Sequence, residues 1–270
     1  MARRGGTKTP PRKPQPLPEP LPPERRTLGQ LVAETISFYQ RHFYQSLPLG
    51  ISVAALTQLT FPFGKHHDEP RGHPPPKWFH EPHSLLGGGI ETTIVLGSLL
   101  LTVSYIAAII LVTGTRPDQR RLLTAYAVGV FIFLPAPLLA AVLGLLALPA
   151  LAYLAFLGWA VPAALVEGRS FRDAMRRSVR LGRVDYVHAL GGLATLVIVF
   201  YVVRLMLALL LRGGGEITER SAAACADLVL SPMLFIGSAV LYLDQEARVR
   251  DRLKPVPDAV VSSRSRTKEA

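Results

Sequence analysis

The chain has almost no cysteine and few charged side chains for its length. Among 270 residues, Cys225 is the only cysteine, which excludes an intramolecular disulfide. It lies in an apolar run and is expected to be a small buried residue. Charged residues make up 18% of the chain, whereas soluble domains usually carry about 25%. The shortage of charge excludes an ordinary soluble domain.

Recognisable catalytic patterns are missing as well. The sequence has no glycine-rich phosphate loop followed by lysine, which argues against an ATP-driven pump. It also lacks the G-x-S-x-G pattern of serine hydrolases. No enzymatic activity and no cofactor are therefore expected. The net charge of +11 could suggest nucleic acid. However, no basic block lies in a soluble segment with interleaved aromatics, so nucleic acid is not an expected partner.

The chain does contain apolar stretches of about the 17–25 residues that cross a bilayer. They predict an all-α, polytopic membrane bundle over residues 27–250. Its six spans are expected at 47–63, 90–113, 123–146, 148–166, 187–211 and 222–243. The polar, proline-rich segment 1–26 and the polar segment 251–270 have too little apolar surface to fold, and are expected to be disordered tails.

The distribution of lysine and arginine predicts the orientation of these spans. With six spans, 24 of the basic residues fall on the side that holds both termini, and five fall on the opposite side. Basic residues favour the cytoplasmic side of a membrane. Both termini are therefore expected in the cytoplasm, in the plasma (inner) membrane of a bacterium.

An arginine-rich segment, 167–183, lies between two apolar runs and contains six arginines. On a helical wheel, residues 171–183 place their apolar and small side chains on one arc and their charges on the other, with Ser170 as the expected N-cap. This pattern predicts a cytoplasmic interfacial helix. The candidate contacts for anionic lipid or phosphate are Arg172, Arg176, Arg180 and Arg183. Two interpretations stay open, namely general attraction to anionic lipid and a specific phosphate site.

Residues 28–43 show the same two-faced pattern and predict a second interfacial helix. Thr27 and Gln30 match a capping box at its start.

Two charged residues, Arg204 and Asp227, fall inside predicted spans. Charges within a membrane are costly and are usually paired. Counted from the outer ends of two adjacent spans, both lie at a similar depth, about 8–10 Å, so an ion pair is expected. It would serve either as a pin between helices or in the passage of a proton or substrate.

Five histidines gather in one predicted outer loop, at His66, His67, His73, His80 and His83. Their spacing matches no ordered metal site, and neighbouring prolines disfavour a compact cage. A solvated, weakly chelating loop is expected, and no specific metal.

Two motifs resemble a known family. The run Val161-Pro-Ala-Ala-Leu-Val-Glu-Gly-Arg-Ser170, with the arginine-rich helix after it, is similar to the membrane domain of some glycerophosphodiester phosphodiesterases and to related stand-alone bacterial membrane proteins. The segment Leu241-Tyr-Leu-Asp-Gln-Glu-Ala-Arg248 resembles that family's closing motif, although the family usually places Arg closer to the Asp. The resemblance covers roughly residues 28–250 and implies a membrane module. The catalytic barrel of those enzymes is absent, so the resemblance implies no activity here.

The sequence thus favours a non-catalytic membrane module with a scaffold, lipid-associated or partner-binding role, whose expected partner is anionic lipid at the cytoplasmic face. A small secondary transporter or its accessory subunit, and a membrane-embedded lipid enzyme, are the alternatives.

Overall fold

Every regular element in the described part of the chain is an α-helix. The structure, a computed structural model, describes residues 26–60, 89–135, 148–210 and 216–253. The helices are α1 (Leu28–Arg41), α2 (Phe43–Thr60), α3 (Gly89–Thr113), α4 (Gln119–Phe133), α6 (Leu148–Leu157), α7 (Ala160–Leu165), α8 (Phe171–Val184), α9 (Tyr186–Leu210) and α10 (Glu216–Leu253). The predicted all-α class is therefore confirmed for these residues.

Three of the described helices are long and apolar enough to cross a membrane. The qualifying stretches are Ile94–Thr113 in α3, Tyr186–Leu207 in α9 and Ser221–Arg252 in α10. Two further apolar stretches, Phe43–Leu56 and Pro149–Leu165, are shorter. The chain thus has the length and composition of an α-helical membrane protein, and the count of six spans stays a prediction. The second half of the expected span 123–146 lies outside the described residues, as do residues 61–63 of the first.

Two helical regions differ in detail from the expected spans. The expected span 148–166 is divided, since α6 ends at Leu157 and α7 begins at Ala160, although its outer bounds agree with the start of α6 and the end of α7. The last helix continues beyond its apolar run, which ends near residue 243, to Leu253, so residues 251–253 of the expected C-terminal tail are helical. Arg26, expected to belong to the N-terminal tail, is held by contacts with the helices. Ion pairs and hydrogen bonds of charged side chains thus hold residues that lie beyond the apolar segments, such as Arg26.

Prolines inside helices explain two features of the packing. Proline lacks the N–H that would bond the carbonyl four residues earlier. The Gly158 carbonyl, left free by Pro162, accepts a hydrogen bond from the Tyr105 hydroxyl of α3 at 3.4 Å. In α10, the carbonyl four residues before Pro232 is that of Leu228, and Gly50 of α2 packs directly against it. A tyrosine hydroxyl of α3 and a glycine of α2 therefore lie against the two carbonyls that the prolines leave without a helical hydrogen bond.

Helix caps and amphipathic faces follow the sequence closely. The capping box of Thr27 and Gln30 is present at the start of α1, and the Ser170 side chain accepts from the Asp173 N–H at the start of α8. Part of the apolar arc of each helix is covered by protein, although Phe171 at the start of α8 is exposed. Leu31 and Tyr39 are buried in α1, and Ala174 and Leu181 are fully buried in α8. Protein packing therefore covers part of both apolar arcs, and the interfacial position of the two helices stays a prediction.

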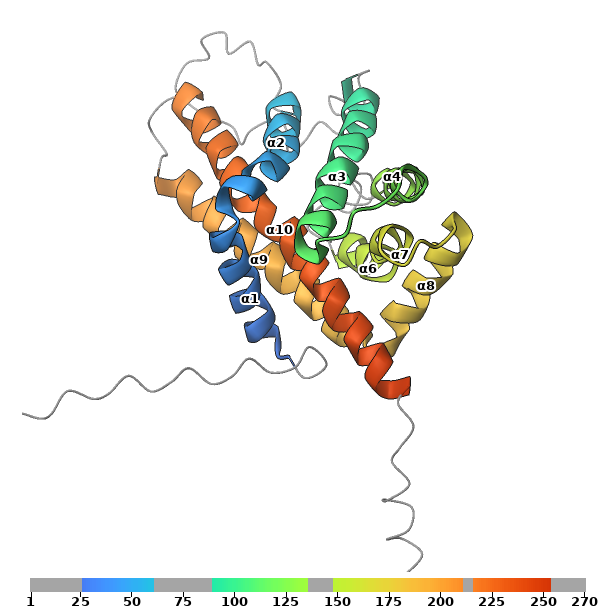
Figure 1. The fold of residues 1–270 in the computed structure, drawn as a ribbon. Coiled ribbons are helices and arrows are strands. Elements are labelled where there is room, and N and C mark those ends of the chain that lie inside the picture. The colour runs from blue at the N-terminus through green and yellow to red at the C-terminus, as the bar shows by residue number, and fades with distance from the viewer. Residues whose placement is uncertain (1–25, 61–88, 136–147, 211–215, 254–270) are drawn as a thin grey trace, which may run out of the picture.

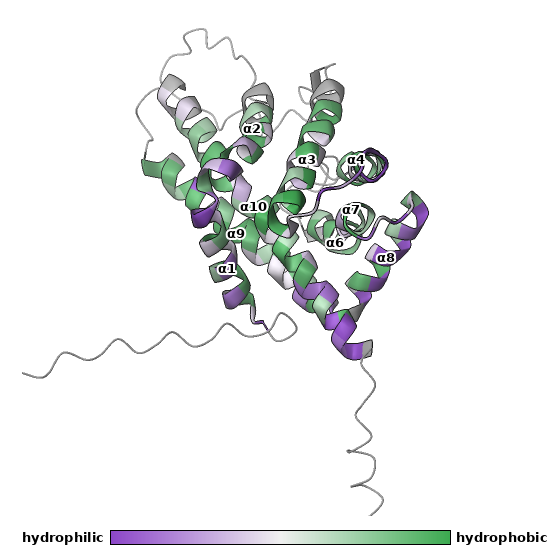
Figure 2. Cartoon of the chain, viewed as in Figure 1, coloured by the Kyte–Doolittle hydropathy of each residue, from purple (hydrophilic) through white to green (hydrophobic). Residues whose placement is uncertain are grey.

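Figure 1 shows how the helices are arranged. α1 and α2 follow one another alongside α10 and run in the opposite direction, and α2–α10 is the most extensive contact between described helices. α9 also lies along α10, while α4, α6 and α7 are seen nearly end-on beside α3. Hydrophilic residues concentrate on α8, on α1 and at the C-terminal end of α10 (Figure 2).

Candidate functional site

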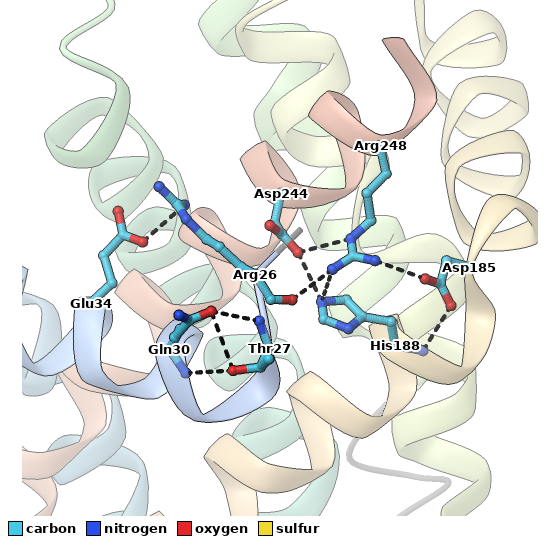
Figure 3. A network of polar contacts seen from close by, with 8 residues as sticks. All are labelled: Arg26, Thr27, Gln30, Glu34, Asp185, His188, Asp244 and Arg248. Atoms are coloured by element: carbon cyan, nitrogen blue, oxygen red, sulfur yellow. Dashed lines mark hydrogen bonds and ion pairs between the residues drawn. The ribbon is translucent and has the colours of Figure 1, made fainter. Parts of the chain in front are cut away.

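The C-terminal end of α10 carries a polar network centred on the Arg248 guanidinium (Figure 3). Its Nε donates to Asp244 of the same helix at 3.2 Å, and Nη1 donates to Asp185, just before α9, at 3.1 Å. Nη2 donates to the backbone carbonyl of Arg26, just before α1, at 2.8 Å. We call Arg26, Asp185, His188, Asp244 and Arg248 the Arg248 cluster. One side chain thus joins α10 to the starts of α1 and α9.

His188 completes this cluster. Its Nε2 lies 2.8 Å from Asp244 Oδ2 and 3.3 Å from Arg248 Nη2. Nε2 can donate to Asp244 or accept from Arg248, and the shorter contact favours the tautomer that donates to Asp244. The His188 backbone N–H also donates to Asp185 at 3.2 Å. The Asp244 side chain is fully buried, and its Oδ2 is contacted by both His188 and Arg248.

A second set of contacts, the Glu167 cluster, joins the two motifs that carry the family resemblance. Glu167 lies between α7 and α8, where its carboxylate accepts from Arg177 Nε at 3.0 Å and from the Tyr242 hydroxyl of α10 at 2.9 Å. Arg169 also donates to it. Residues 161–181 and 241–248 therefore meet in space through Glu167, Arg177 and Tyr242.

The Glu167 carboxyl titrates below its ordinary range. Burial raises its pKa, but hydrogen bonds from Arg169, Arg177 and Tyr242 together lower it by more, so the net pKa is reduced. A carboxylate with a lowered folded-state pKa contributes stability above its unfolded pKa, and this contribution is lost as the pH falls through the folded-state pKa. At neutral pH, the Glu167 cluster is therefore held together by an ionised carboxylate.

The remaining arginines of α8 differ from Arg177 in their surroundings. Arg177 lies on the predicted basic arc, yet its side chain is only 12% exposed because it reaches Glu167. The four predicted anion contacts, Arg172, Arg176, Arg180 and Arg183, are all exposed. Within the described ranges, none of the four forms an ion pair. The structure thus leaves four exposed guanidinium groups on α8, a helix in which Figure 2 shows many hydrophilic residues.

Arg204 and Asp227 form the ion pair that their similar depth predicts. Arg204 Nε lies 2.9 Å from Asp227 Oδ1, and Nη2 donates to Oδ2 at 3.2 Å. The Asp227 side chain is fully buried, and that of Arg204 is 30% exposed. One hydrogen bond, from Nη2, and an ion-pair contact from Nε join the two side chains. The contact fixes α9 against α10 near the ends opposite to the Arg248 cluster.

The two polar sites bracket an apolar segment of nearly membrane thickness. At 1.5 Å per residue, His188 and Arg204 are about 24 Å apart along α9, and Asp227 and Asp244 are about 26 Å apart along α10. The hydrocarbon core of a bilayer is about 30 Å thick. No Asp, Glu, Lys or Arg lies between the sites on either helix. The α9–α10 pair can therefore cross a membrane with its charges near the two edges.

Comparison with known proteins adds no assignment. No protein-family model, curated protein or solved structure matches this chain. The resemblance to the phosphodiesterase membrane domain therefore stays a hypothesis.

Other sequence expectations have mixed outcomes. The five histidines of the expected outer loop lie outside the described residues. Where the structure describes the chain, no group of three or more His, Cys, Asp or Glu could hold a metal ion. The expected burial of Cys225 is wrong, since it is exposed and lines an open apolar groove of about 460 Å³ with residues of α9 and α10. Cys225 lies in an apolar run of the sequence, yet the rest of the protein does not cover its side chain.

Sequence reasoning missed most of the network residues. His188, Asp244 and Arg248 lie at the ends of apolar runs, where charge is expected on topological grounds alone. The available signal was spacing, because Asp244 and Arg248 are four residues apart and so share a helix face. The link from Tyr242 to Glu167 joins residues 75 positions apart and has no local signal.

Proposed function

We propose that the chain is a non-catalytic membrane module that binds anionic lipid through the outer face of α8. The observation that supports this is the unequal use of the α8 arginines. Arg177 and Arg169 both pair with Glu167, while Arg172, Arg176, Arg180 and Arg183 are exposed. Each basic residue near an anionic membrane surface contributes roughly 1 kcal/mol of attraction.

The topology in this proposal has six spans, with both termini and α8 on the cytoplasmic side of a bacterial plasma membrane. The uneven distribution of lysine and arginine supports this orientation. Membership of the phosphodiesterase-type membrane-domain family is part of the same proposal. It is supported by the two motifs, and contacts between them through Glu167 and Tyr242 give those motifs a structural role.

A lipid titration with a charge-matched control tests the proposal. Detergent-solubilised protein is titrated with fluorescent phosphatidylglycerol or phosphatidylcholine. The test variant replaces Arg172, Arg176, Arg180 and Arg183 with Gln. The control replaces the exposed arginines Arg41, Arg116, Arg120 and Arg252 with Gln and so removes equal charge. We expect the α8 variant to weaken phosphatidylglycerol binding at least tenfold, because four contacts of roughly 1 kcal/mol are lost.

The control variant is expected to change binding less than threefold, and phosphatidylcholine is expected to bind weakly to all three proteins. Equal losses in the two variants would show that total charge, and not the α8 face, attracts the lipid. Equal binding of the two lipids by the unmodified protein would also contradict the proposal.

A further inference from the structure

The four exposed arginines of α8 form a single row, made up of Arg172, Arg176, Arg180 and Arg183. At about 100° per residue, they lie within an arc of about 80°, roughly opposite Ala174 and Leu181, which are fully buried. Along the helix axis the row is about 16 Å long, and neighbouring arginines are about 4.5–6 Å apart. The arginine row thus lies opposite the packed side of α8, with one guanidinium group from each successive turn.

Little negative charge offsets this row. Within α8 the one carboxylate is that of Asp173, which accepts a hydrogen bond from the Ser170 hydroxyl at 2.6 Å. Glu167, before the helix, pairs with Arg169 and Arg177. Like charges one turn apart on a helix destabilise it. A ligand with negative charges at the spacing of the arginines relieves this repulsion.

An exposed pair of aromatic rings lies at the start of the arginine row. Phe171, directly before Arg172, is 40% exposed, and Phe131 of α4 is 56% exposed. Their ring centroids are 5.6 Å apart in an edge-on contact. Exposed phenylalanine beside arginine is typical of surfaces at the boundary between lipid head groups and acyl chains. This pair favours a lipid over a soluble phosphate compound as the ligand.

We propose that the arginine row binds a lipid with two phosphates joined by a short bridge, such as diphosphatidylglycerol, which rests on the proposed function and names the lipid class. A glycerol bridge is similar in length to one helical turn, about 5.4 Å. The two phosphates of one molecule therefore reach arginines on successive turns, and arginine binds phosphate with good geometry. Once the first phosphate is bound, the second binds within the same complex, so the linked pair binds more tightly than two separate phosphates.

Two variants with equal charge and different spacing test this inference. Detergent-solubilised protein is titrated with fluorescent diphosphatidylglycerol or phosphatidylglycerol at equal phosphate concentration. The unmodified protein is expected to prefer diphosphatidylglycerol by at least about tenfold. Replacing Arg172 and Arg183 with Gln leaves two arginines about 6 Å apart along the axis, whereas replacing Arg176 and Arg180 with Gln leaves two about 16 Å apart. We expect the first variant to keep a several-fold preference and the second to keep less than about twofold, because one molecule cannot bridge the wider gap.

The outcomes separate this inference from the proposed function. The same preference in both variants would show that the number of arginines, and not their spacing, attracts the lipid, and would overturn the inference. No preference in the unmodified protein, with phosphatidylglycerol still bound better than phosphatidylcholine, would overturn the inference and leave the proposed function standing. Glycerol bisphosphate, which has no acyl chains, is expected to displace little bound diphosphatidylglycerol at equal concentration. Displacement of half the lipid would contradict a lipid ligand.

Discussion

Gly50→Ala is expected to destabilise the protein by about 3 kcal/mol or more. A Cβ at this position would lie 2.1 Å from the Leu228 carbonyl oxygen and 2.7 Å from its carbonyl carbon. These are backbone atoms of α10, so no rotamer change relieves the clash. Overpacking usually costs about 1–3 kcal/mol. We expect the upper end or beyond, because whole helices must separate at the most extensive helix–helix contact of the described structure.

Unfolding in a graded detergent mixture, followed by circular dichroism, measures the effect of Gly50→Ala. Gly29→Ala in α1 is the matched control, because nothing lies within 4 Å of a Cβ added there. Alanine is favoured over glycine in a helix by up to about 1 kcal/mol, so the control should be neutral or slightly stabilising. If the two variants have the same stability, α2 does not pack on α10 in this way.

Arg248→Leu is expected to cost about 3–5 kcal/mol. The substitution removes the donors to Asp244, Asp185 and the Arg26 carbonyl at once. Asp244 is fully buried, and removing one partner of a buried ion pair leaves an uncompensated charge, which accounts for losses of this size. The start of α1 also loses its attachment to α10. Chemical unfolding gives the stability, and hydrogen exchange is expected to show faster opening of α1.

Arg250→Leu is the control for Arg248→Leu on the same helix. Its side chain is 71% exposed and pairs with Glu246, so a loss of at most about 1 kcal/mol is expected. The double variant Arg248→Leu, Asp244→Leu should be less destabilised than Arg248→Leu alone, because no buried charge is left behind. Additive losses would mean that Arg248 does not compensate Asp244.

Local features of the fold could be predicted from the sequence because their causes are local. The caps at Thr27 and Ser170 follow from side chains within three residues of the helix start. The arcs of α1 and α8 follow from helical periodicity. The contact between Arg204 and Asp227 was also predictable, because two charges at equal depth on adjacent helices have few other partners in an apolar environment.

Features that depend on packing between distant segments could not be predicted in this way. At the break between α6 and α7, the Tyr105 hydroxyl of α3 donates to the Gly158 carbonyl, and hydropathy does not record that contact. The extension of α10 to Leu253 depends on partners for Asp244 and Arg248 on other helices. For the same reason, the sequence predicted the amphipathic faces but not which of their apolar residues, such as Leu31 and Leu181, pack against other helices.

Labelling single cysteines from the two sides of the membrane tests the orientation of the module most directly. In a Cys225→Ser background, Arg180→Cys reports on α8, and Lys77→Cys reports on the segment between α2 and α3. Right-side-out and inside-out vesicles are treated with a membrane-impermeant maleimide. The predicted result is labelling of Arg180→Cys only in inside-out vesicles and of Lys77→Cys only in right-side-out vesicles. Labelling of both positions from the same side would contradict a membrane-crossing module with a cytoplasmic arginine face.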